Sequence, residues 1–68
     1  MNLKVLVARK RQELTQEQLA EATDMTPNDI SRIEKFGWVP PPTGRQRLAE
    51  ALQVSVADLF DLNDQVAS

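Results

Sequence analysis

Apolar residues recur every three to four positions along most of the chain, which is the spacing of amphipathic helices. In a first helix over about residues 2–12, Val5 and Ala8 share a stripe with Met1 and Gln12. Four more helices are predicted over about residues 16–22, 27–35, 44–52 and 56–62. Their core positions are Leu19, Ala20, Ile30, Ile33, Leu48, Ala49, Leu52, Leu59 and Phe60. No run alternates with period two for long enough to indicate a sheet, so the sequence predicts an all-α fold.

Four hydroxyl residues stand three positions before a glutamine or an aspartate, which is the spacing of a capping box. In such a box the hydroxyl accepts a backbone N–H in the first helical turn, and the later side chain accepts the N–H of the capping residue. We expect each pair to mark the start of a helix. The pairs are Thr15 with Gln18, Thr26 with Asp29, Thr43 with Gln46, and Ser55 with Asp58.

Only about three residues, 24–26, separate the second and third predicted helices. So short a connection makes two helices cross steeply, as in a helix-turn-helix. After the third helix, Gly37 can end the helix and the prolines at 40–42 stiffen an extended loop. The expected organisation is one domain over residues 1–62 followed by a frayed polar tail over residues 63–68.

The composition removes several classes of function. The chain has no cysteine and no histidine, so it lacks the ligands of most zinc sites and the commonest general base. It also lacks a glycine-rich phosphate loop and a paired-carboxylate signature. We therefore expect no enzyme, no metal and no cofactor. No apolar run approaches the roughly 18 residues that span a bilayer, and the first residues are unlike a signal peptide, so we expect a cytoplasmic protein without a membrane partner.

The net charge of −2 is unusual for a protein that binds nucleic acid, but the charges are unevenly placed. All eight basic residues lie within residues 1–48, where six acidic residues leave a positive excess. Residues 49–68 hold four acidic residues and no basic one. Because exposed charges are screened over about 8 Å, local charge governs the attraction to phosphate, and the first part of the chain can meet nucleic acid.

Three segments, taken in their order and spacing, resemble the phage-repressor/Cro-like (Xre-type) helix-turn-helix family. They are Leu14-Thr15-Gln16-Glu17-Gln18-Leu19-Ala20, Ile30-Ser31-Arg32-Ile33-Glu34 and Arg47-Leu48-Ala49-Glu50-Ala51-Leu52-Gln53-Val54-Ser55. The resemblance covers roughly residues 3–60. It implies a compact five-helix, lambda-repressor-like DNA-binding domain whose third helix, about residues 27–35, enters the major groove. The implied function is that of a sequence-specific transcriptional regulator, a repressor that occupies an operator in double-stranded DNA.

The resemblance also implies roles for single residues. On the outer side of the third helix, an arginine can bond guanine through two donors and an asparagine can bond adenine in the same way. The candidates for base reading are Asn28, Ser31 and Arg32, and those for phosphate contact are Thr15, Gln16, Thr26 and Lys35. Arg9 and Glu34 match a family pair that joins the first and third helices, so they are expected to form a partly buried structural ion pair.

The chain departs from the family pattern in ways that would weaken the contact of a single protein molecule with DNA. Pro27 replaces a common base-reading residue, Asp24 a turn glycine and Thr23 a core leucine. The loop after the third helix lacks basic residues, which Arg45 and Arg47 can offset. A homodimer on DNA, with recognition helices about 34 Å apart, would strengthen binding. The candidate dimer contacts are Val56, Phe60 and Leu62, and the single Trp38 either covers the core or lies in an interface.

A second class of function stays open at this point. The acidic composition, Pro27 and the uncharged loop favour a protein-interaction module that kept the fold and lost DNA binding. The polar residues assigned to DNA contact favour a DNA operator as the partner. No small-molecule ligand is expected. Binding to duplex DNA that weakens steeply with salt would separate the two functions.

Overall fold

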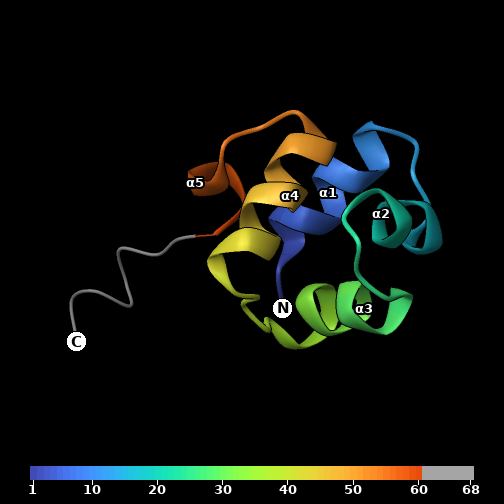
Figure 1. The fold of residues 1–68 in the computed structure, drawn as a ribbon, viewed down its shortest axis with the longest axis horizontal. Helices are drawn as coiled ribbons and strands as arrows, with labels where there is room; N and C mark the ends of the chain where they lie inside the picture. Colours follow the sequence, from blue (N-terminus) through green and yellow to red (C-terminus); the bar gives the residue numbers. More distant parts are fainter. Residues whose placement is uncertain (61–68) are drawn as a thin grey trace.

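Five helices surround one apolar core in the computed structural model, which describes residues 1–60 (Figure 1). They are α1 (Leu3–Arg11), α2 (Gln16–Ala22), α3 (Pro27–Phe36), α4 (Pro42–Leu52) and α5 (Val56–Leu59). Within this part of the chain there is no strand, and the prediction of an all-α fold is confirmed. The predicted bounds of α2 agree with those of the structure.

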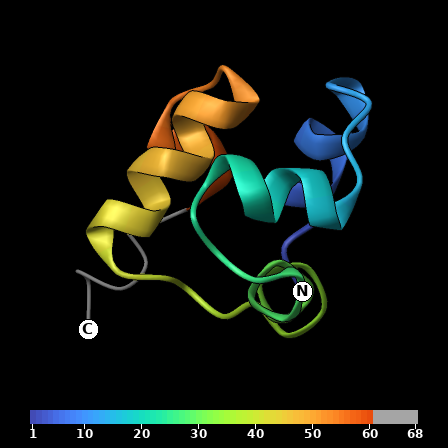
Figure 2. The same cartoon turned by 45° about the vertical axis from the view of Figure 1, so that its right-hand side comes forward.

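Helix α3 lies across α2, and the other helices complete the core behind this pair. In Figure 2, α3 is viewed nearly along its axis while α2 runs across the picture, so the two cross steeply, as the short turn between them predicts. Helix α1 packs against α3 and α5, whereas α4 packs against α2 and α5. Asp24 adopts the left-handed backbone conformation in the α2–α3 turn, with φ 58°, which aspartate tolerates better than most residues.

Three of the four predicted capping boxes are confirmed. Both hydrogen bonds of the box form between Thr15 and Gln18, between Thr26 and Asp29, and between Ser55 and Asp58. In the last pair, the backbone N–H and the side chain of Ser55 hold the pKa of Asp58 below its ordinary value. Local hydrogen bonding therefore marks the start of α2, α3 and α5 as the sequence predicts.

The predicted capping box of Thr43 with Gln46 is wrong, because α4 begins earlier, at Pro42. Pro41 is the N-cap and makes no side-chain hydrogen bond. A proline in the first turn has no N–H to satisfy and already holds a helical φ, so Pro42 can start the helix without a hydroxyl. Gln46 instead donates to Glu50 over 3.3 Å on the exposed side of α4.

The two ends of the described chain also differ from the prediction. Helix α1 begins at Leu3, and Asn2 is its N-cap, with Oδ1 accepting from the N–H of Val5 over 3.0 Å. The Asn2 amide also donates to the carbonyl of Leu59 over 3.0 Å, which ties the start of α1 to the end of α5. Helix α5 ends at Leu59, earlier than predicted. The predicted tail over residues 63–68 lies outside the described residues.

Every residue that the sequence assigns to the core is buried, except Met1 and Gln12, which end the apolar stripe predicted for the first helix. The buried set is Val5, Ala8, Leu19, Ala20, Ile30, Ile33, Leu48, Ala49, Leu52, Leu59 and Phe60. Met1 and Gln12 are exposed because they lie beyond the ends of α1, where the helical stripe stops. Thr23, which stands where the family pattern has a core leucine, is fully buried. Its hydroxyl donates to the carbonyl of Leu19 over 2.7 Å, so the buried polar group has a hydrogen-bond partner.

Candidate nucleic-acid interface

Helix α3 has a buried inner side and an open outer side. Ile30, Ile33 and Glu34 are buried against the rest of the fold. Since a helix turns once in 3.6 residues, the positions between them project outward. On the outer side, Pro27, Asn28, Arg32 and Lys35 are exposed and Ser31 is half-buried. All three candidate base-reading side chains and Lys35 therefore lie on one accessible, largely polar surface, which we call the outer face of α3.

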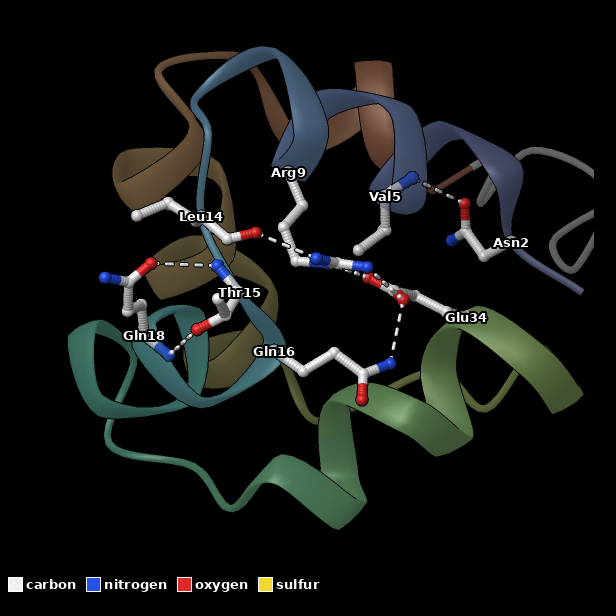
Figure 3. Close-up of polar contacts among 8 residues, drawn as sticks. All are labelled: Asn2, Val5, Arg9, Leu14, Thr15, Gln16, Gln18 and Glu34. Carbon is white, nitrogen blue, oxygen red and sulfur yellow. Dashed lines mark hydrogen bonds and ion pairs between the residues drawn. The ribbon is translucent and has the colours of Figure 1, made fainter.

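A bidentate ion pair joins the inner side of α3 to α1, as Figure 3 shows. Nε of Arg9 lies 2.7 Å from Oε2 of Glu34, and Nη2 lies 3.2 Å from Oε1. The two side chains are 11% and 4% exposed. Nη1 of Arg9 also donates to the carbonyl of Leu14 over 2.8 Å, at the end of the loop between α1 and α2. One arginine thus connects α1, this loop and α3.

Gln16 is the second side-chain partner of Glu34. Its Nε2 donates to Oε1 of Glu34 over 3.1 Å, so the first residue of α2 is bonded to the inner side of α3 (Figure 3). The amide is half-buried and keeps one N–H and its carbonyl oxygen for other partners. The resemblance implies only a phosphate contact for Gln16. This bond has no sequence signal, because nothing in local spacing shows that α2 and α3 bring these two side chains together.

Thr15 and Thr26 are both exposed at helix starts. Each hydroxyl oxygen accepts a backbone N–H in its capping box, at 3.0 Å from Gln18 and at 3.1 Å from Asp29. A hydroxyl has one donor besides its acceptor lone pairs, so the O–H hydrogen of each threonine stays free to bond an outside oxygen. Capping and phosphate contact are therefore compatible at both residues.

Arg32 lies between two partners from its own chain. Its Cζ is 4.3 Å from the centroid of the Trp38 ring, and its Nη1 is 3.7 Å from Oδ1 of Asp29. The Asp29 contact is the i, i+3 spacing visible in the sequence, but the Trp38 contact spans the end of α3 and no sequence pattern predicts it. Trp38 is half-buried and packs against the core, which agrees with the core-covering alternative.

The two arginines of α4 also bond within the chain. Nη1 of Arg45 donates to the carbonyl of Pro40 over 3.1 Å, and Nη1 of Arg47 lies 3.6 Å from Oδ2 of Asp24. The Asp24 side chain is 90% exposed, so water screens this second pair strongly. Arg45 braces the loop before α4, whereas Arg47 is loosely held and can exchange its partner.

The candidate dimer residues lie at or beside the core. Phe60 is only 4% exposed, and Val56 is half-buried and packs against the core. Leu62 lies outside the described residues. A second copy can reach little of Phe60 without rearrangement. Among residues 1–60 the exposed large apolar side chains are Met1, Leu3, Val7 and Phe36. The sequence predicts Met1 on the core stripe and no role for the other three.

Within residues 1–60, no helix is both long and apolar enough to cross a bilayer. The same residues bring together no group of three or more acidic, histidine or cysteine side chains that could hold a metal ion.

Two short helices that cross steeply over a four-residue turn, the second with an open polar side, define a helix-turn-helix protein. Comparison with known families agrees, because the family model described as a helix-turn-helix domain matches residues 7–62. The chain belongs to this helix-turn-helix domain family. No curated protein and no solved structure matches it.

Proposed function

We propose that this protein is a sequence-specific regulator of transcription that reads the major groove of double-stranded DNA with α3, about residues 27–35. The observation that carries the proposal is the open, polar outer face of α3 opposite a side anchored by Arg9 and Glu34. An α-helix fits a major groove about 12 Å wide, and each base pair presents a distinct set of donors and acceptors there. Helix-turn-helix proteins dock in this way.

The outer face supplies side chains suited to base edges. Arg32 can donate two hydrogen bonds to guanine, and Asn28 can bond adenine as donor and acceptor. Ser31 is small enough to let the helix approach the groove closely. Pro27, also exposed, contributes no donor, so base reading on this face rests on these three residues.

Phosphate contacts would border the outer face. Thr15 and Thr26 keep a free hydroxyl hydrogen, and Lys35 is exposed near the end of α3. Gln16 is bonded to Glu34 of α3, so a phosphate held by its remaining N–H lies at a set place relative to the recognition helix. Such contacts fix the position of a protein on the duplex and leave sequence reading to the base edges.

In this proposal the protein acts by occupancy and not by catalysis. A repressor of the phage-repressor/Cro-like type that covers an operator needs no cofactor and no small-molecule ligand, and it works in the cytoplasm, where the DNA is. The proposed unit is residues 1–62, bound as a homodimer with recognition helices one DNA turn, about 34 Å, apart. The proposed dimer contacts are Val56, Phe60 and Leu62. Because Phe60 is buried, Val56 offers a partner more accessible surface than Phe60 does.

Selection of bound duplexes from a random pool tests the proposal directly. The expected result is an enriched motif with two related half-sites, and an affinity for the best duplex that falls steeply as salt rises. Enrichment of no motif, together with no duplex binding at low salt, would contradict DNA reading. That outcome would favour a protein-interaction module, for which the exposed Met1, Leu3, Val7 and Phe36 are the available apolar contacts.

A further inference from the structure

Trp38 lies beside Arg32, although it belongs to the loop after α3 and not to the helix itself. Gly37 makes this possible, because its left-handed backbone, with φ 71°, turns the chain at the end of α3. The backbone N–H of Trp38 then donates to the carbonyl of Arg32 over 3.2 Å. The two residues are thus linked through the backbone as well as through the 4.3 Å contact of guanidinium and indole.

The indole is held more firmly than the arginine that rests on it. Trp38 is half-buried and packs against the apolar core, whereas the Arg32 side chain is 45% exposed. A side chain at Gly37 would strain this turn, since φ is positive and a Cβ there would meet the backbone nitrogen of Met1 at 3.1 Å. The ring therefore restricts the arginine, and not the reverse.

The contact leaves the hydrogen-bonding edge of Arg32 available. The guanidinium has five N–H donors, and with 45% of the Arg32 side chain exposed a single indole ring does not cover them all. Asp29 takes one of these donors only at 3.7 Å, which is longer than a hydrogen bond. A guanine edge needs two N–H donors in that plane. Trp38 can thus order the side chain while donors of the exposed guanidinium stay available to a base.

We infer that Trp38 determines specificity at this interface by orienting Arg32 toward guanine. The inference rests on the proposed reading of DNA by α3. A freely moving arginine loses rotamer freedom when it binds a base and can equally bond a nearby phosphate, whereas a stacked arginine is already partly ordered. Loss of the stack should therefore weaken the preference for the best site more than it weakens binding to DNA in general.

The first test replaces the indole by a side chain that still covers the core. Dissociation constants of the wild type and of Trp38→Leu are compared for the best selected duplex and for duplexes in which each guanine pair is replaced in turn. At the pair read by Arg32, Trp38→Leu should lower the discrimination about 3- to 10-fold. Trp38→Phe, with a smaller ring, should give a smaller fall. In an Arg32→Ala background, Trp38→Leu should change the discrimination no further.

A second readout needs no DNA, because Trp38 is the single tryptophan of the chain. Arg32→Ala should move the fluorescence emission of the free protein to longer wavelength, since the uncovered indole meets more water. Lys35→Ala is the matched control, because it removes an exposed cation of α3 that does not lie over the ring. Its emission should equal that of the wild type.

The outcomes separate this inference from the proposed function. If the wild type discriminates among duplexes, the inference is overturned by unchanged discrimination in folded Trp38→Leu, by additive effects of the two substitutions, or by unchanged emission of Arg32→Ala. Should Trp38→Leu not fold, as judged by circular dichroism, unchanged discrimination in Trp38→Phe overturns it. If the wild type binds all duplexes alike, the proposed function fails and the inference fails with it.

Discussion

Helix α3 has an arginine–carboxylate pair on each of two sides, and the two pairs differ in geometry and in exposure. On the inner side, Arg9 meets Glu34 through two bonds of 2.7 and 3.2 Å, and both side chains are almost fully covered. On the outer side, Arg32 meets Asp29 at 3.7 Å, and the two side chains are 45% and 29% exposed.

The inner pair therefore holds α3 in place, whereas the outer pair belongs to the surface that α3 offers to a ligand. Charges removed from water are costly unless they are paired and hydrogen-bonded, so the inner pair cannot open without stranding a charge. An exposed pair gains little, is screened by salt and exchanges partners readily. One helix can therefore be anchored firmly on one side while its other side stays free to bind.

The largest expected effect comes from breaking the inner pair. Arg9→Ala leaves the Glu34 carboxylate buried with only the Gln16 amide as a side-chain partner, and should lower the free energy of unfolding by about 3–5 kcal/mol. Urea denaturation followed by circular dichroism measures this change. In a domain of this size such a loss is a large part of the total stability.

The matched control for the inner pair removes both charges. Arg9→Met combined with Glu34→Leu strands no charge and should be clearly milder than Arg9→Ala. If the single and double variants lose the same stability, or if Arg9→Ala unfolds like the wild type, the inner pair does not anchor α3 as described.

The next effect concerns the outer pair and appears in DNA binding. Arg32→Ala should reduce discrimination between the best duplex and one with a replaced guanine pair by about 1–3 kcal/mol. Its unfolding free energy should fall by no more than about 1 kcal/mol, because the residue is exposed and a cation–π contact at such a site contributes about 0.5–1 kcal/mol. Competition binding and urea denaturation of the same preparation give both values. An equal loss of affinity on all duplexes would show that Arg32 touches only phosphate.

A third effect concerns the N-cap of α3, which lies at the edge of the outer face and also stabilises the helix. Thr26→Ala removes the hydroxyl that accepts the Asp29 N–H and should cost about 1 kcal/mol in thermal or urea unfolding. Thr43→Ala is the matched control, because Thr43 is exposed in α4 and caps nothing. Equal losses in the two variants would mean that the Thr26 cap does not support α3.

The smallest expected effect is electrostatic. Lys35→Ala should weaken binding to all duplexes by a similar factor and reduce the slope of log affinity against log salt by about 1, because one phosphate contact is lost. Its unfolding free energy should stay within about 0.5 kcal/mol of the wild type. A titration at several salt concentrations measures the slope, and an unchanged slope would place Lys35 away from phosphate.

Much of the fold follows from local sequence because local forces create it. The helical periodicity of apolar residues identified the core, and three hydroxyl–carboxamide or hydroxyl–carboxylate spacings marked helix starts. The same reasoning failed at α4, where two prolines start the helix ahead of the hydroxyl. It also counted Asn2 as the first residue of α1, whereas Asn2 caps the helix and its amide bonds the carbonyl of Leu59. That second bond joins the two ends of the described chain and has no local signal.

The candidate site divides in the same way. The sequence predicts which residues lie outward on α3, because the 3.6-residue repeat alone decides this. It does not predict that Gln16 bonds Glu34 or that Trp38 lies on Arg32.

By itself, then, the sequence determined the helices, most of their caps, the core and the outward-facing set of α3, since these depend on neighbours within about one helical turn. Only the tertiary structure decided the partners of Arg9, Gln16 and Arg32. Those contacts join side chains that are distant in the sequence or separated by a left-handed turn, and the packing of the helices brings them together.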